Sequence, residues 1–455
     1  MLRSALMFAL ILMPCFVSLQ AETDQSKRPN FIVIMADDMG YADASCYGND
    51  RYQTPHLDAL ARNGMRFTDF HTSGTVCSPT RAGLLTGRYQ QRVGIPGVVF
   101  ADPKRPAHRD GLQTSEITFA EPLKAAGYAT AIVGKWHLGY YPKYNPVRHG
   151  FDLFRGYVSG NIDFFSHYDQ AGNYDWWDGE NKIEEEGYTT HLITKHAVKF
   201  IKQNKDKPFC LYVPHEAPHY PYQGPNDKAE RIPGQKFVTL GARKDRAQAY
   251  AEMMEEMDKG IGEIVATVKQ LGLSENTLIM FLSDNGATSL GNNGPLRGTK
   301  GQVWEGGHRV PFIASWPGKI KPGTVSDSMT FSLDIMPTML SLANATVPEG
   351  HHMDGVDLTN VLFKGESNTT RKMHWYGRAM RDGKWKLIAG GGAGRPKNGP
   401  IPRKPIALYD LSTDIGESTN VAADHPDRVK NMLAAMAAWE EDVKRGATVQ
   451  PSHSK

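Results

Sequence analysis

The segment NFIVIMADDMG, residues 30–40, holds six successive apolar side chains, and two aspartates follow them at once. An apolar run without alternation predicts a strand that is buried on both faces, as in a mostly parallel sheet. Three further runs have the same character: ATAIVG (129–134), PFCLYV (208–213) and TLIMFLS (277–283). We expect all four runs to belong to one large sheet.

Helical patterns lie between these runs, at residues 54–65, 118–128 and 247–272, the last with apolar residues three and four positions apart. Strands that alternate with helices predict an α/β fold, here a large, mostly parallel sheet flanked by helices. Within the third helix, Glu255, Glu256 and Asp258 are expected on the solvent face.

The pattern changes after about residue 355. Asp382 and Gly383 are a strong hairpin signal between two strand-like runs, residues 406–412 read as another strand, and residues 425–445 as a closing helix. We therefore predict a smaller C-terminal α+β subdomain with an antiparallel sheet and a terminal helix. The predicted division is a signal peptide at 1–21, a catalytic domain at 22–355 and this subdomain at 356–455.

The N-terminal residues 1–21 combine one basic residue, Arg3, with a short apolar run that Pro14 interrupts. This pattern is typical of a cleaved secretory signal, and the run is too short for a membrane span. We expect a secreted or periplasmic protein. The formal net charge of +3 predicts no nucleic-acid partner.

Polar residues follow two of the apolar runs directly: Asp37 and Asp38 after the first, Asp284 and Asn285 after the last. In an open parallel sheet, ligands bind beyond the carboxyl ends of the strands, so the four residues are expected to face one crevice. Each pair alone is also explained as the opening of a turn. Both pairs at equivalent strand ends favour a hard cation with oxygen ligands, Ca²⁺ or Mg²⁺.

The stretch TVCSPTRAGLLTGRY, residues 75–89, places a lone cysteine before a predicted helix start, with Ser78 as N-cap and Pro79 as the first helical residue. The free amides and the dipole of such a helix attract an anion, and Arg81 can reach the same point. There the Cys77 thiol would be acidified and reactive. A thiol protease would also need a histidine and an Asn or Asp partner, which nothing local marks.

Together with five other segments, CSPTRAGLLTGR resembles the signature of the type I, formylglycine-dependent sulfatases of the alkaline phosphatase-like superfamily. The other segments resemble the family's two metal segments, its Lys/His segment, its second histidine segment and its last lysine segment. They read PNFIVIMADDMGYAD (29–43), LSDNG (282–286), GKWHLG (134–139), PHEAPHYPY (214–222) and LRGTKGQVWEGGHRVP (296–311).

This resemblance implies that Cys77 is oxidised after synthesis to 3-oxoalanine (formylglycine), by a formylglycine-generating or sulfatase-maturing enzyme. The hydrated aldehyde attacks the sulfur of a sulfate ester with one hydroxyl and expels sulfate with the help of the other. The resemblance further implies that Ca²⁺ is held by residue 77 together with Asp37, Asp38, Asp284 and Asn285.

Five further residues are similar to the family's catalytic groups. Arg81 would orient the nucleophile, and Lys135, Lys300 and His219 would clamp the sulfate oxygens. His219 or Lys300 would protonate the departing alcohol, and His137 would take the proton that releases sulfate. A positioned acid of this kind contributes about 10²- to 10⁴-fold for a poor leaving group.

The predicted function is hydrolysis of sulfate esters, with sulfated carbohydrates as the expected substrates. The alternatives are a phosphatase or phosphonate hydrolase of the same superfamily and a non-catalytic glycan-binding homologue. No histidine lies between Asn285 and Gly301, so the ligands of a two-metal phosphatase are missing there.

Several neighbouring residues receive other predictions. His56, His71 and His149 are expected on the surface or in packing, because no metal spacing joins them. The aromatic residues at 173–179 are expected to form either a sugar-stacking wall or a buried loop anchor. Pairing of Cys46 with Cys210 stays open.

Overall fold

The computed structural model describes residues 28–235, 240–367, 370–390 and 406–452. The predicted signal peptide at 1–21 lies outside these residues. Among the helices of the described ranges, none combines the length and apolar character that a membrane span requires.

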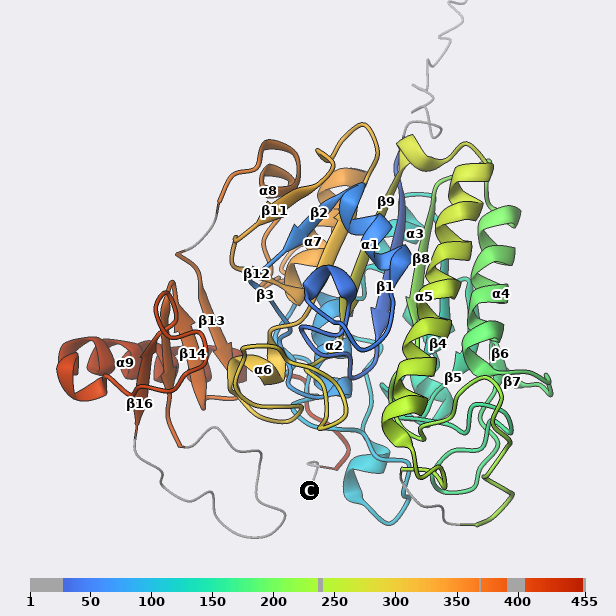
Figure 1. The fold of residues 1–455 in the computed structure, drawn as a ribbon, viewed down its shortest axis with the longest axis horizontal. Coiled ribbons are helices and arrows are strands. Elements are labelled where there is room, and N and C mark those ends of the chain that lie inside the picture. Colours follow the sequence, from blue (N-terminus) through green and yellow to red (C-terminus); the bar gives the residue numbers. More distant parts are fainter. Residues whose placement is uncertain (1–27, 236–239, 368–369, 391–405, 453–455) are drawn as a thin grey trace, which may run out of the picture.

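A sheet of ten strands forms the centre of the molecule, in the order β11-β2-β10-β9-β1-β8-β4-β5-β6-β7 (Figure 1). Its strands are β1 (Asn30–Ala36), β2 (Met65–Phe67), β4 (Ala129–Lys135), β5 (Leu153–Tyr157), β6 (Trp177–Asp178), β7 (Asn181–Lys182), β8 (Phe209–Pro214), β9 (Thr277–Ser283), β10 (Phe312–Ser315) and β11 (Thr324–Ser326). A two-stranded sheet joins β3 (Phe70–His71) to β12 (Thr330–Phe331).

The four apolar runs of the sequence become β1, β4, β8 and β9, which lie side by side and run parallel. The antiparallel strands β10, β6 and β7 extend the sheet on its two flanks. The predicted α/β fold with a mostly parallel sheet is confirmed. Because the central strands are parallel, the residues that follow them meet at one edge.

Helices cover both faces of the sheet. The helices of this part of the chain are α1 (Pro55–Arg62), α2 (Cys77–Thr86), α3 (Ala120–Ala125), α4 (Thr189–Gln203), α5 (Arg246–Gln270), α6 (Glu305–His308), α7 (Ile335–Ala343) and α8 (Thr359–Lys364), of which all but α6 pack on the sheet. One face packs against α1, α4 and α5, and the other against α2, α3, α7 and α8. In β1, Phe31 and Val33 enter one core while Ile32 and Ile34 enter the other, which explains why the run does not alternate.

Asp258 lies elsewhere than predicted. It is buried on α5, and its carboxylate accepts the backbone N–H groups of His56 at 3.0 Å and Leu57 at 2.8 Å. These amides belong to the first turn of α1, where Thr54 makes no side-chain cap. The prediction of a solvent-facing Asp258 is wrong, because a carboxylate of a neighbouring helix satisfies the free amides of α1.

The C-terminal part forms a separate four-stranded antiparallel sheet, to one side of the large sheet in Figure 1. It contains β13 (Lys372–Trp375), β14 (Ala379–Asp382), β15 (Trp385–Ile388) and β16 (Ala407–Asp410), with α9 (Pro426–Lys444) on one face. The predicted hairpin is present, but Asp382 pairs with Trp385, so its turn residues are Gly383 and Lys384, one position later than Asp382 and Gly383, with φ of 57° at Gly383. The domain boundary at residue 355 stays a prediction.

Candidate active site

Buried polar residues gather at the carboxyl edge of the large sheet. Asp37 and Asp38 follow β1, Asp284 and Asn285 follow β9, Lys135 ends β4 and His219 lies beyond β8. All six are at most 4 % exposed. The parallel order of the strands thus brings together segments that are up to about 250 residues apart in the chain.

Three basic side chains contact the carboxylates. Lys135 Nζ forms an ion pair with Asp37 Oδ2, and Arg81 Nη2 lies 3.0 Å from Asp284 Oδ2. Lys300 Nζ lies 2.7 Å from Oδ2 and 2.6 Å from Oδ1 of Asp38. A cluster of carboxylates this deeply buried requires such positive charge, because burial alone disfavours ionisation.

The pKa values of Asp37 and Asp284 are shifted in opposite directions. Burial would raise the pKa of Asp37, but Lys135 and further basic neighbours hold it well below its ordinary value. Burial and the nearby Asp37 raise the pKa of Asp284 to about 7. The protein's own cations therefore leave one carboxyl of the cluster poorly stabilised as an anion.

The residues present fit a metal ion. Ligand atoms of Asp37, Asp38, Cys77 and His219 all lie within 4.8 Å of one another. Asn285 donates its Nδ2 to Asp38 Oδ1 at 2.8 Å, while its buried Oδ1 has no hydrogen-bond partner among the described residues. An orphaned amide oxygen beside carboxylates is the donor set that a hard divalent cation prefers. The buried cluster can hold a metal ion.

Cys77 is the first residue of α2, and Val76 is its extended N-cap. The predicted N-cap role of Ser78 is wrong: its Oγ instead accepts the N–H of Val99 at 3.2 Å. Cys77 Sγ lies 3.4 Å from both Asp37 Oδ1 and Lys300 Nζ.

The prediction of an acidified thiol at Cys77 is also wrong. Burial and then Asp37 raise the pKa of Cys77 above its ordinary value, against the smaller effects of Lys135 and Lys300. The unmodified side chain is therefore a neutral thiol and a poor nucleophile.

His137 is held in a constrained position. Its backbone has φ of 55°, which non-glycine residues rarely adopt, and a Cβ on Gly160 would lie 2.7 Å from its Nε2. Nε2 lies 2.9 Å from the carbonyl oxygen of Val99, so it carries the proton. Nδ1 is buried without a described partner, and burial, followed by Lys135, holds the pKa of His137 well below its ordinary value. A neutral ring with a free Nδ1 can accept a proton.

His219 is neutral as well. Its Nδ1 lies 2.7 Å from the carbonyl oxygen of Tyr220, and its Nε2 lies 3.6 Å from Asp38 Oδ2. Burial lowers the pKa of His219 to about 4, although Asp37 acts in the opposite direction. By contrast, Asp38 overcomes the effect of burial and holds the pKa of Lys300 well above its ordinary value.

A cavity of about 170 Å³ opens above these residues. Its polar end is formed by Cys77, His137, His219 and Lys300, and its other lining residues are Val98, Val99, Phe100, Ala101, Tyr140, Gly160, Asn161, Gln170 and Tyr220. The aromatic segment 173–179 contributes no lining residue. Its Trp176 is fully buried and stacks on His167, which supports the loop-anchor alternative.

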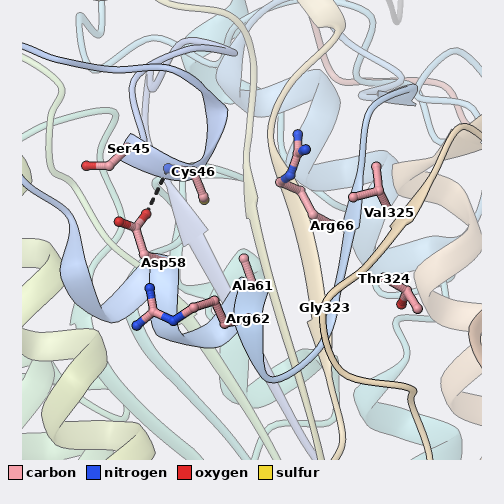
Figure 2. Close-up of a pocket in the computed structure, with 9 residues that line it drawn as sticks. All are labelled: Ser45, Cys46, Asp58, Ala61, Arg62, Arg66, Gly323, Thr324 and Val325. Atoms are coloured by element: carbon pink, nitrogen blue, oxygen red, sulfur yellow. Dashed lines mark hydrogen bonds between the residues drawn. The ribbon is translucent and has the colours of Figure 1, made fainter.

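A second hollow, of about 300 Å³, lies between α1, β2 and β11 (Figure 2). Cys46 lines it, with its backbone N–H bonded to Asp58 Oδ1 at 2.8 Å. Burial and then Asp58 raise the pKa of Cys46 to about 12. Cys210 is buried in β8, and both cysteines are free thiols, so the pairing left open by the sequence is not formed.

The small sheet contributes residues that sequence reasoning missed. Trp375 Nε1 donates to the carbonyl of Thr72 at 2.8 Å, and Tyr376 Oη accepts the N–H of Thr75 at 3.0 Å. Both contacts hold the loop that leads into Cys77. Tyr376 has φ of 55°, a conformation that is unusual for a bulky residue. The sequence around it reads as an ordinary strand end, so no local signal points to this contact.

Replacing Tyr376 by phenylalanine is expected to lower kcat about 3- to 30-fold with a smaller change in KM. The substitution leaves the N–H of Thr75 without its acceptor and loosens the helix start that carries Cys77. Steady-state kinetics on nitrophenyl sulfate measure the effect, and Tyr141→Phe, at an exposed tyrosine, is the control. An unchanged kcat would contradict the supporting role of Tyr376.

A second buried cluster of potential ligands lies where the small sheet contacts the large domain. It consists of His71, Glu305 and His308. The Nδ1 atoms of His71 and His308 are 3.0 Å apart, and Lys386 Nζ lies 2.8 Å from Glu305 Oε1 and 2.7 Å from His308 Nε2. The ammonium group thus already neutralises Glu305. This cluster joins the small sheet to the large domain through charge pairing.

A large sheet flanked by helices, with a buried acidic edge and a helix that begins at Cys77, is the arrangement of the alkaline phosphatase-like fold. The family model described as Sulfatase matches residues 29–345, and the chain belongs to the sulfatase family.

Three comparisons illustrate the relationship. The chain is 31% identical to arylsulfatase A of Homo sapiens, over 92% of this chain and 88% of that protein. It is 34% identical to N-acetylgalactosamine-6-sulfatase of Mus musculus, over 74% and 67%. The solved structure of Ps i-CgsB in complex with k-i-k-neocarrahexaose superimposes with a TM-score of 0.80 at 29% identity, over 93% and 95%. The protein is accordingly a sulfuric ester hydrolase.

Proposed function

We propose that this enzyme hydrolyses sulfate esters of carbohydrates with a formylglycine nucleophile made from Cys77 and a single Ca²⁺. The observation that carries the proposal is that carboxylates, lysines and histidines from five separate segments gather near Cys77, which lines one cavity together with His137, His219 and Lys300. The test is release of sulfate from singly sulfated sugars by the matured enzyme.

The proposed calcium ligands are residue 77 and the side chains of Asp37, Asp38, Asp284 and Asn285. The orphaned Oδ1 of Asn285 and the raised pKa of Asp284 support this set, because a divalent cation would satisfy both. When bound, Ca²⁺ supplies positive charge where negative charge develops during the reaction. His219, whose Nε2 approaches Asp38, is proposed to face the substrate.

The neutral state of the Cys77 thiol supports its role as a precursor. A thiol whose pKa is raised by burial and by Asp37 is a weak nucleophile, so direct thiolate attack is disfavoured. Formylglycine, when formed, supplies a hydrated aldehyde with one hydroxyl to attack sulfur and a second to expel sulfate. We propose that a separate maturation enzyme carries out the oxidation of Cys77, and that the protein is secreted or periplasmic.

The other polar residues are proposed to act on the substrate. Lys135 and Lys300 hold the sulfate oxygens, since Lys135 pairs with Asp37 and Lys300 pairs with Asp38 beside Cys77. His219, whose Nε2 lies 3.6 Å from Asp38 Oδ2, joins this clamp only when Nε2 carries a proton. Arg81, which is fixed by Asp284, orients the nucleophile. His137 accepts a proton at Nδ1 because its Nε2–H is engaged by Val99.

The leaving alcohol is proposed to receive its proton from Lys300. Lys300 lines the cavity and keeps its proton, whereas neutral His219 carries its proton on Nδ1, bound to Tyr220. Lys300→Ala should therefore slow a sugar sulfate about 10²-fold or more, and nitrophenyl sulfate at least tenfold less, because a phenolate leaves unaided. His219→Ala should slow both substrates equally. The opposite pattern in kcat/KM would assign the acid to His219.

Sulfate monoesters should be preferred over phosphate monoesters by at least about 10²-fold in kcat/KM. The site provides two ammonium groups, Lys135 paired with Asp37 and Lys300 paired with Asp38, in place of the second metal that helps to stabilise a dianionic ester. Matched nitrophenyl sulfate and phosphate on fully matured enzyme measure the ratio. A higher value for the phosphate would support the phosphatase alternative.

A further inference from the structure

We propose that the sugar ring bearing the reacting sulfate is neutral, with no second sulfate and no carboxylate on that ring. This inference rests on the proposed function and concerns the part of the cavity that lies beyond the catalytic groups. It names a class of substrate within sulfated carbohydrates, and it assigns Asn161 and Gln170 as the residues that recognise the hydroxyl groups of this ring.

The first argument is the charge of the cavity lining. Away from the catalytic end, the described lining residues are apolar or uncharged, and Asn161 and Gln170 supply the amide groups among them. Lys300 is the one lysine or arginine among the lining residues that the structure describes. Its ammonium group pairs with Asp38, and the proposed function assigns it to the reacting sulfate. A second anion on the same ring would therefore enter without a partner.

The second argument is the way in which Asn161 is held. The buried guanidinium of Arg231 donates to Asn161 Oδ1 at 2.7 Å through Nη2. Its Nη1 donates to the carbonyl of Tyr168 at 3.1 Å. Arg231 is thus engaged behind Asn161 and is not among the residues that line the cavity. With Oδ1 occupied, Asn161 retains its Nδ2 group as a donor, which suits a hydroxyl or ring oxygen.

The third argument is the aromatic wall of the cavity. Tyr140 stacks on His108, with ring centroids 4.9 Å apart and planes at 22°. His108 is in turn anchored by its Nδ1 to the carbonyl of Phe100 at 2.8 Å. Tyr140 and Phe100 both line the cavity. Such a wall matches the apolar C–H face of a sugar ring, and neither Tyr140 nor Phe100 carries a charge that could pair with an anion.

A basic residue does lie close to the rim. Arg105 is exposed and lies 4.3 Å from the centroid of the Phe100 ring. Anionic groups on the next residue of an oligosaccharide could contact it there. Only the sugar ring inside the cavity is therefore required to be neutral, because an unpaired charge there loses its hydration.

The experiment compares matched sugars on the matured enzyme, for each position of the reacting sulfate. One member of a pair is a singly sulfated N-acetylhexosamine or hexose; the other carries an additional N-sulfate or has its C6 oxidised to a carboxylate. We expect kcat/KM to be at least about 30-fold higher for the neutral member. Equal or reversed values would overturn the inference and leave the sulfatase activity standing.

Nitrophenyl sulfate is assayed in parallel, so that the two failures are distinguishable. Hydrolysis of the aryl ester and of the doubly anionic sugars, without hydrolysis of any otherwise neutral singly sulfated sugar, would overturn the inference alone. Loss of aryl ester hydrolysis in fully matured enzyme would overturn the proposed function, and the inference with it.

A charge substitution tests the cause directly. Gln170→Lys places a cation in the lining, and the ratio of kcat/KM values should shift at least about tenfold toward the doubly anionic member of the pair. Gln170→Met, of similar length and without charge, is the control and should leave the ratio in favour of the neutral sugar. An unchanged ratio in Gln170→Lys, with the melting temperature preserved, would overturn the assignment of Gln170.

Discussion

Replacing Cys77 by alanine is expected to lower kcat/KM by at least about 10⁴-fold while the protein stays folded. Residue 77 is buried at the start of α2, with Sγ 3.4 Å from Asp37 and from Lys300, and the substitution removes the nucleophile of the proposed mechanism. The loss is measured on nitrophenyl sulfate with enzyme produced in a host that has a maturation enzyme. Circular dichroism and the melting temperature check the fold.

The control for this substitution is Cys210→Ala. Cys210 is also a buried free thiol, but it belongs to β8 and does not line the cavity. It should lower stability and leave the kinetics of the folded fraction unchanged. In active protein, the tryptic peptide from Phe67 to Arg81 should have the mass of an aldehyde at residue 77. Full activity in protein whose Cys77 is entirely unmodified would contradict the precursor role.

Removing the metal ion is expected to lower activity by at least about 10³-fold and the melting temperature by several degrees, and Ca²⁺ should restore both. Without a cation, burial and Asp37 work against the ionised form of Asp284, and Asn285 Oδ1 lacks a partner. Asp284→Ala should behave like the chelated protein. The measurements are kinetics, thermal unfolding and elemental analysis of the same sample.

Asp206→Asn is the matched control, since Asp206 is an exposed carboxylate whose ion pair with Lys205 is local. It should leave both activity and calcium content unchanged. Retention of activity after exhaustive chelation, with elemental analysis showing no divalent metal, would count against a metal site at Asp37, Asp38, Asp284 and Asn285.

Much of the site's location could be predicted from the sequence, because it depends on a simple rule of parallel sheets. Asp37 follows β1 and Asp284 follows β9, and these neighbouring strands are parallel, so the two carboxylates share an edge despite their separation in the chain. The absence of alternation in the apolar runs indicated burial on both faces. Both features can be recognised within a few consecutive residues, because the apolar or polar character of a short segment shows whether it is buried or exposed to water.

Lys300 and His219 could be assigned to the site only through their resemblance to family motifs. Lys300 lies in a loop that carries no periodic pattern, and its approach to Asp38 follows from the path of the chain between β9 and α6. His219 similarly lies in a loop beyond β8. Spacing and composition cannot place such residues, since loop conformation depends on what surrounds the loop.

The sequence by itself determined the α/β class, the central parallel strands, the acidic edge and the hairpin of the small sheet. Only the tertiary structure decided that Asp258 caps a neighbouring helix, that Tyr376 supports the loop before Cys77, and that the Cys77 thiol is neutral. The reason is physical: burial patterns repeat along a few residues and can be recognised locally. A helix cap, a hydrogen bond that supports a loop and the pKa of a buried group instead depend on charges and donors that folding brings together from distant segments.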